Sequence, residues 1–407
     1  MITAGPELVS TVGRLRASLG ATDSYVTEND FLGYDPYDAL LSPLFTLPFL
    51  RSSHYTRLAA QQALRRLPVN IRPLLGIRKH AGPVTFAWML EAYVHLWAID
   101  ADRRGYWGAQ AEVCLRRIAE LRSPGYYSGD CWGYEFDWEA RYATIPAGVP
   151  NIVATGIVAN ALFEAQRVLG SRFARDSCVH SAEFLLHDLR RTAGPDGSFC
   201  WSYSPGDDQV VLNATMKGAR LCAQAYSLTG DVRLRDAARD TVAFVAGHQR
   251  PDGAWPYAIG DTRSWVDNFH TGYVLDCLES YERHAGDDSF RAAKERGWGY
   301  YRSRFLTEEY VPKYLDDQVY PTDSTACAQT ISTLCTFGDL DAAARVASWT
   351  LANMRRSDGA FVYQRHARYT NRIRYLRWSI APMFCALARL LHAIETSSRR
   401  DDSGSAS

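Results

Sequence analysis

Apolar positions recur with a helical period along most of the chain and mark two kinds of helix. Helices of the first kind are apolar on nearly every face, are rich in small residues, and recur at intervals of about 55 to 67 residues. A helix that is apolar all round is buried within a core. We therefore predict six inner helices, which begin near Val84, Asn151, Asn213, Asn268, Asp323 and Trp378.

Helices of the second kind lie between these and carry charge on one side only. An amphipathic helix covers a core with its apolar face and meets water with the other. Turns of the form Asp-Gly follow the same period, at Asp196, Asp252 and Asp358. We therefore predict six outer helices, over residues 53–66, 107–122, 174–190, 232–248, 288–304 and 339–354.

Six pairs of one inner and one outer helix close most simply into an all-α (α/α)6 toroid, a six-hairpin barrel. An open superhelical solenoid is the alternative, but the chain has no polar capping repeat, which favours closure. Strand signals are limited to short hairpins in loops such as 197–204 and 253–258. We expect an N-terminal extension over 1–30, a single toroid domain over 31–395 and a disordered tail over 396–407.

The charge balance excludes one large class of partner. The 407 residues include 45 Lys and Arg and 45 Asp and Glu, so the formal net charge is +0, without the basic excess typical of nucleic-acid binding. No basic segment followed by an apolar core opens the sequence, and the most apolar early run, 39–50, is broken by prolines. We expect a chain that is not exported, with no transmembrane segment and no nucleic-acid partner.

The nine cysteines never form a Cys-x-x-Cys pair, which favours reduced, buried thiols over disulfides or a zinc cluster. A cytoplasmic location is the matching expectation. No cluster of His, Cys and carboxylates has the spacing of metal ligands, and the glycine-rich nucleotide-binding, zinc-protease and serine-hydrolase motifs are absent. The sequence therefore predicts no metal and no cofactor.

Aromatic residues make up 12 % of the chain, and many lie in loops that enter the predicted inner helices. In a toroid these loops gather at one end, where their side chains would line a funnel. Aromatic rings stack on the C–H faces of sugars, while charged and amide groups bind the hydroxyls. We predict a sugar site whose binding residues are Trp132, Tyr134, Arg141, Trp201, Asn213, Trp255, Tyr257, Asn268, Arg377 and Trp378.

His270 is the strongest candidate for acid or base chemistry, because an imidazole two residues into a helix has no capping role and Asp267 lies three residues before it. A hydrogen-bonded core histidine is the alternative. A capping role alone would explain Asp323, so that both a cap and a catalytic group stay open there. Asp35 with Asp38 is expected to form a turn rather than a catalytic pair. The candidate catalytic residues are His270, Asp267, Tyr203, Asp137 and Asp323.

Seven motifs, spread in order over about residues 31 to 393, resemble a family of bacterial proteins encoded in exopolysaccharide and other glycan-assembly gene clusters. The resemblance implies the α/α toroid that is shared by squalene-cyclase and prenyltransferase barrels and by several uronate lyases, glycosidases and epimerases. The family's His after the acid near position 323 is replaced here by Ser324 and Thr325. The motifs are Gly33-Tyr34-Asp35-Pro36-Tyr37-Asp38 and residues 70–77, 132–138, 150–153, 202–205, 265–272 and 320–323.

Three functions stay open at this point. The first is an enzyme of glycan or glycoconjugate biosynthesis that acts on a sugar. Proton abstraction from a uronate would need a base such as His270 or Tyr203, and a group that neutralises the carboxylate, such as Asn213, Arg141 or Arg377. A hydrolase would instead pair Asp267 with Asp137 or Asp323. The second is a terpenoid cyclase or prenyltransferase, although its aspartate-rich motifs are missing. The third is a non-catalytic glycan-binding partner in an assembly complex.

Overall fold

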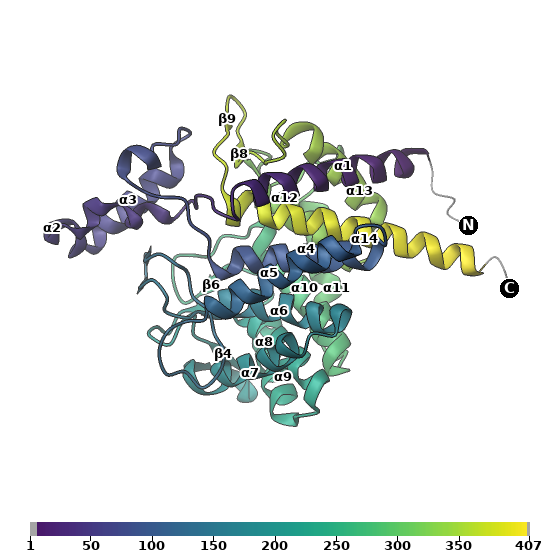
Figure 1. The fold of residues 1–407 in the computed structure, drawn as a ribbon. Helices are drawn as coiled ribbons and strands as arrows, with labels where there is room; N and C mark the ends of the chain where they lie inside the picture. The colour runs from purple at the N-terminus through teal and green to yellow at the C-terminus, as the bar shows by residue number, and fades with distance from the viewer. Residues whose placement is uncertain (1–5, 405–407) are drawn as a thin grey trace.

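The computed structural model describes residues 6–404 and shows a closed ring of helices, which confirms the predicted (α/α)6 toroid (Figure 1). Each inner helix contacts the next one in the chain, and the last contacts the first, so the ring is closed and the open solenoid is excluded. The inner helices are α4 (Pro83–Ile99), α6 (Ile152–Leu169), α8 (Leu212–Thr229), α10 (Asn268–Ala285), α12 (Ser324–Thr336) and α14 (Ala381–Gly404).

The outer layer differs from the prediction at one position. Five outer helices pack as expected against the inner ring, and the sixth place is taken by α1 (Pro6–Glu28), which contacts α13 and α14. The barrel therefore includes residues before position 31. The five are α5 (Arg104–Glu120), α7 (Arg172–Asp188), α9 (Val232–Gly247), α11 (Arg291–Arg304) and α13 (Leu340–Asn353).

The helix expected over 53–66 exists as α3 (His54–Arg66), but it is not an outer helix of the barrel. It contacts a short 3-10 turn, η1 (Asp38–Leu41), and the strand β1 (Trp138–Ala140). Its buried Leu64 packs with Ala39 and Ile77 in a small cluster separate from the main core. An amphipathic pattern shows that one face of a helix is covered but does not show which element covers it. For this reason the prediction placed this helix in the outer layer of the barrel.

Helix caps fix where the inner helices begin and end. Asn151, Asp267 and Asp323 each accept a backbone N–H of the following turn, as caps of α6, α10 and α12. At the other end, Gly230 adopts the left-handed conformation that leads α8 into the outer helix α9. At the end of the chain, α14 continues through 396–404 of the expected tail, and residues 405–407 lie outside the described residues.

Short antiparallel strand pairs join the loops at the N-terminal ends of the inner helices. A predicted hairpin over 197–204 is present in part, as β3 (Arg191–Ala193) with β4 (Phe199–Trp201). The expected hairpin over 253–258 is wrong, because β6 (Ala258–Ile259) pairs with β5 (Val210–Val211) and so ties two neighbouring loops together. Two further groups are β1 with β2 (Ala143–Ile145), and β7 (Thr322–Asp323) with β8 (Gln364–Arg365) and β9 (Thr370–Asn371).

The core lies between the inner and outer helices and holds the thiols. All nine cysteines are unpaired, and all except the partly buried Cys335 are buried. Among residues 6–404, α6 alone is long and apolar enough to cross a membrane, and 61 % of it is buried in the ring.

Contact between α1 and the loop before α14 gives a test of this arrangement. Gly359 has a φ of 84°, and a Cβ there would lie 2.2 Å from the carbonyl oxygen of Ala21 in α1. Gly359→Ala should lower the free energy of unfolding by about 2–4 kcal/mol, through left-handed strain and steric overlap. Gly338→Ala is the control, because its φ is 75° with no atom within 4 Å, so only strain remains. If urea unfolding shows the same loss of unfolding free energy for Gly359→Ala and Gly338→Ala, the close packing of α1 against Gly359 is contradicted.

Candidate functional site

A cavity of about 430 Å³ opens at the N-terminal end of the inner ring. The second residue of every inner helix lines it, which confirms that the equivalent helix starts meet at one end of the barrel. Of the predicted site residues at helix starts, Asn213 lines the cavity, whereas Asn268 and Asp323 lie one and two positions before the lining residue. The six second residues are Val84, Val153, Asn213, Phe269, Thr325 and Pro382.

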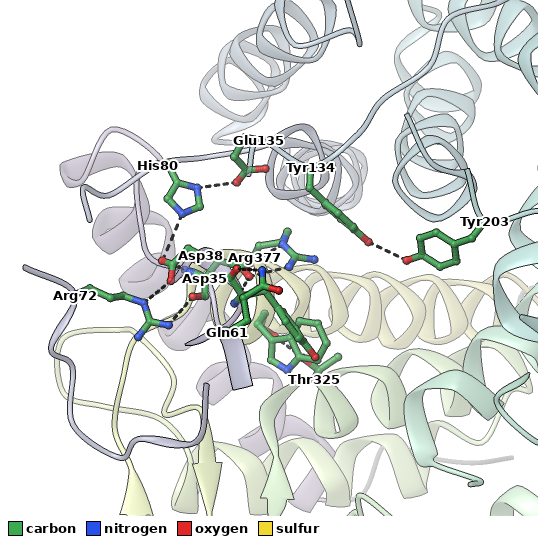
Figure 2. Close-up of polar contacts among 12 residues, drawn as sticks. Asp35, Asp38, Gln61, Arg72, His80, Tyr134, Glu135, Tyr203, Thr325 and Arg377 are labelled. Carbon is green, nitrogen blue, oxygen red and sulfur yellow. Dashed lines mark hydrogen bonds and ion pairs between the residues drawn. The ribbon is translucent and has the colours of Figure 1, made fainter. Parts of the chain in front are cut away.

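Aromatic side chains form the walls, as the sequence predicted for Tyr134, Tyr257 and Trp378. Tyr257 stacks on Trp265 with ring centroids 4.9 Å apart. The Tyr134 and Tyr203 hydroxyls lie 3.3 Å apart (Figure 2). Burial raises the pKa of each of these three tyrosines, so the phenols stay protonated at neutral pH and can donate hydrogen bonds.

His270 lines the cavity and is oriented by Asp267. Its Nδ1 lies 2.6 Å from Asp267 Oδ2, and the same carboxylate accepts the His270 backbone N–H and the Trp265 indole N–H. The Asp267 side chain is fully buried, whereas that of His270 is 23 % exposed. Because Asp267 occupies Nδ1, Nε2 is the ring nitrogen left for a substrate.

A chain of buried ion pairs holds one wall of the cavity (Figure 2). Arg377 forms two hydrogen bonds with the Asp35 carboxylate, at 2.6 and 2.9 Å, and its guanidinium lies 4.8 Å from the centre of the Tyr134 ring. The expected turn at Asp35 and Asp38 is present, but both carboxylates also bind arginine. The sequence prediction therefore missed that this turn fixes Arg377.

His80 extends this chain of charges. It lies 2.8 Å from Glu135 Oε1 and 3.5 Å from Asp38 Oδ2, and Asp38 in turn accepts from Arg72 Nε at 2.7 Å (Figure 2). Burial alone would lower the pKa of His80, but its two carboxylate neighbours raise the pKa to about 9. The imidazolium is therefore charged at neutral pH and belongs to the ion-pair chain rather than to the cavity.

The cavity carries an excess of positive charge. Within residues 6–404, Arg263 and Arg377 have carboxylate partners, whereas Arg65, Arg66 and Arg141, the other arginines of the lining, have none. Glu139 is the one lining carboxylate of the described chain, and Arg57 and His54 bind it at 2.6 Å each. Such an arrangement suits an anionic group on a bound molecule.

Several residues predicted to bind substrate lie in the core instead. Trp132 and Trp255 donate to the backbone oxygens of Ile118 and Val245, and neither lines the cavity. Trp201 is buried and reaches the space left open by a helical glycine, Gly218. Asn268 is buried between Thr330 and Tyr301. A tryptophan that follows a tight turn can pack into the core of its own repeat. Residue type alone does not distinguish such a tryptophan from one that lines a cavity.

None of the three candidate catalytic carboxylates lines the cavity: Asp267 lies behind His270, and the other two have partners elsewhere. Asp137 binds Arg57 at 3.0 Å and accepts the backbone N–H of Ala147. Asp323 caps α12 and accepts from Gln364 at 2.9 Å, and burial raises its pKa to about 6. Both carboxylates have partners within the protein and lie outside the cavity lining, and their catalytic role stays a prediction.

The structure also brings to the site residues that the sequence prediction missed. Arg65 reaches the cavity from α3 and lies 5.1 Å from the Tyr37 ring centre. Beneath the lining residue Tyr273, Lys217 Nζ is 3.4 Å from the ring centre, and burial lowers the pKa of Lys217 to about 7. A lysine in the first half of a predicted inner helix was a visible signal.

In the described part of the chain, no three His, Cys, Asp or Glu side chains gather in a way that could hold a metal ion. Metal and cofactor independence stays a prediction.

No family model matches the sequence, and no curated protein is similar to it. Solved structures share its fold. A cellobiose 2-epimerase from Bacillus thermoamylovorans gives a TM-score of 0.61 at 12 % identity, over 79 % of this chain and 90 % of that one. An unsaturated glucuronyl hydrolase specific for heparin gives 0.62 at 12 % identity, over 95 % and 98 %. A D-mannose isomerase gives 0.57 at 11 % identity, over 77 % and 87 %. The shared feature is the (α/α)6 barrel.

The buried Lys217 predicts an unusual pH dependence of stability. Because the folded pKa is about 7 and the unfolded pKa is about 10.4, the unfolded chain binds more protons between these values, so this group makes stability rise with pH across that range. Lys217→Met lacks this contribution. Its free energy of unfolding should exceed that of the wild type most at about pH 6 and least at about pH 9, measured by urea unfolding. A difference that does not change with pH would contradict a neutral buried lysine.

Proposed function

We propose that the protein is a carbohydrate-active enzyme that transfers a proton to and from a sugar. The observation that carries this proposal is the Asp267–His270 pair, in which a fully buried carboxylate orients an imidazole whose remaining nitrogen is free at an aromatic cavity. A carboxylate that fixes the imidazole tautomer is the usual arrangement for a histidine base. The fold shared with a sugar epimerase, a sugar isomerase and a glucuronyl hydrolase supports the same class.

The carboxylates favour proton abstraction over hydrolysis. Hydrolysis of a glycosidic bond normally uses two carboxyl groups on either side of the bond. Here Asp137, Asp267 and Asp323 lie outside the lining, and Arg57 forms an ion pair with the one lining carboxylate of the described chain, Glu139. An epimerase or lyase needs instead a base and a means of stabilising a carbanion, and His270 and the unpaired arginines supply these.

The cavity charge favours a uronate as the substrate. Arg65 and Arg141 have no ion pair in the described chain, and the Asn213 Nδ2 is buried at the lining without a partner. The six inner helices also direct their N-termini, with their partial positive charge, toward this cavity. The same cations disfavour a terpenoid cyclase, because they would repel a carbocation.

The reaction steps follow for a uronate substrate. His270 Nε2 accepts the C5 proton, and the C–H electron pair moves into the carboxylate, where the arginines and Asn213 neutralise the added charge. Return of a proton to the opposite face, from a phenol such as Tyr203, gives the epimer. Alternatively, the electron pair of the carbanion forms a C4=C5 double bond and breaks the C4–O4 bond, and the departing O4 oxygen takes a proton from a phenol such as Tyr203, which gives the unsaturated lyase product. The resemblance to glycan-assembly proteins supports the further proposal that this reaction serves cytoplasmic polysaccharide biosynthesis, with an assembly complex as partner.

Deuterium exchange tests the role of His270. Wild-type protein in D₂O should exchange the C5 proton of glucuronate- or mannuronate-containing oligosaccharides, followed by ¹H NMR. His270→Gln should slow this exchange about a hundredfold or more, the usual loss for acid or base help, with an unchanged melting temperature. Asp323→Asn is the control, because Asn also caps a helix, and it should exchange normally. A destabilised but fully active His270→Gln would end the assignment in favour of a core histidine.

Arg65 tests the substrate charge. If it binds the carboxylate, Arg65→Gln should weaken the binding of glucuronate about 10- to 100-fold, the range for hydrogen bonds to charged groups, and leave the weak binding of glucose unchanged. Calorimetric titration of both sugars measures this. Arg116→Gln, at an exposed arginine of α5 without an ion pair in the described chain, should change neither. Equal weakening for both sugars would show that Arg65 shapes the cavity without contacting the carboxylate.

A further inference from the structure

One segment of the chain has a charge pattern unlike the rest. Residues 39–90 contain seven Arg and Lys and no Asp or Glu, in a protein whose overall charge is balanced. Ion pairs use up Arg57 and Arg72, and Arg65 lines the cavity. The remaining arginines, Arg51, Arg66 and Arg78, are exposed and have no ion pair among the described residues. The segment therefore presents unneutralised positive charge to the outside.

The same segment exposes a group of aliphatic and aromatic side chains. Phe49 is 68 % exposed and Leu74 is 86 % exposed, and Leu44, Leu47 and Val69 are exposed as well. These side chains follow one another on short elements, η2 (Pro43–Thr46), α2 (Pro48–Arg51) and η3 (Arg72–Leu75), around the small separate cluster of Ala39, Leu64 and Ile77. Monomeric proteins rarely expose so many large apolar groups together without a binding role.

The segment stands at the mouth of the cavity. Four residues of α3, namely Leu58, Gln62, Arg65 and Arg66, line the cavity itself. In Figure 1, α2 and α3 project from the barrel on the side opposite to the start of α1 and the end of α14. A surface that binds this projection would therefore lie close to the opening through which a substrate enters.

We propose that residues 41–79 dock the protein on an anionic lipid bilayer. Aliphatic side chains such as Leu44, Leu47 and Leu74 would enter the boundary between headgroups and acyl chains, while Arg51 and Arg78 bind lipid phosphates. A second copy of this chain fits less well, because two such surfaces would bring like charges together. An acidic glycan fits less well, because aliphatic side chains offer it no stacking faces. The proposal does not depend on the role of His270.

Vesicle sedimentation tests this proposal with the full chain. The protein should sediment with vesicles of phosphatidylcholine and phosphatidylglycerol, and at least tenfold more weakly with phosphatidylcholine alone. The double variant Phe49→Ser, Leu74→Asn should lose at least tenfold in binding to the anionic vesicles, and Arg51→Gln and Arg78→Gln should each lose about fivefold. Val232→Ser, at a 52 % exposed valine of α9, and Arg116→Gln are the matched controls and should bind as the wild type does.

Three results would overturn the proposal. The first is failure of the wild type to sediment with anionic vesicles, or equal binding to neutral ones. The second is a concentration-dependent dimer, seen by sedimentation velocity, that the double variant abolishes, because a second copy would then cover the surface. The third is binding of polygalacturonate that the double variant also abolishes, because the surface would then serve an acidic glycan. All substituted positions are exposed, so circular dichroism and melting temperature should match the wild type.

Discussion

The burial of inner helices that are apolar on most of their faces is the constraint on which the rest of this structure depends. Such a helix must be covered on all sides, and a closed ring with an outer layer does this for all of its members at once. Ring closure also fixes polarity, because each inner helix returns to the same end of the barrel through its outer partner. The position of the cavity, at the end of the barrel where the inner helices begin, follows from this packing alone.

The period of the sequence was sufficient to predict this architecture, because a repeat records local helix pairs that are covered in the same way. It was not sufficient to place α1 and α3. Both are amphipathic, and their partners lie far along the chain: α1 packs against α13 and α14, and α3 against β1. Long-range contacts of this kind leave no periodic trace, so the position of each helix depended on three-dimensional packing.

The candidate site was predictable from the sequence where its residues lie close together along the chain. His270 follows Asp267 by three positions, which brings a helix cap and a first-turn side chain together. Arg377 and Asp35 are 342 residues apart, and only the closed ring brings them into contact. The prediction that Trp132 and Trp255 line the cavity was wrong for a different reason. Tryptophan is expected in a cavity wall, but the indole N–H groups of these two residues donate to backbone oxygens of their own repeats.

The position of α1 has a consequence for the order in which the protein can be assembled during translation. This helix is synthesised before the other helices of the barrel, yet its partners α13 and α14 are synthesised after all the others, and the hydroxyl of Thr22 donates to the carbonyl of Gly359 in the loop between them. The apolar face of α1 therefore stays uncovered until the rest of the ring has been made. Closure of the toroid needs the earliest and the latest of these helices together, so the barrel cannot be completed one helix pair at a time.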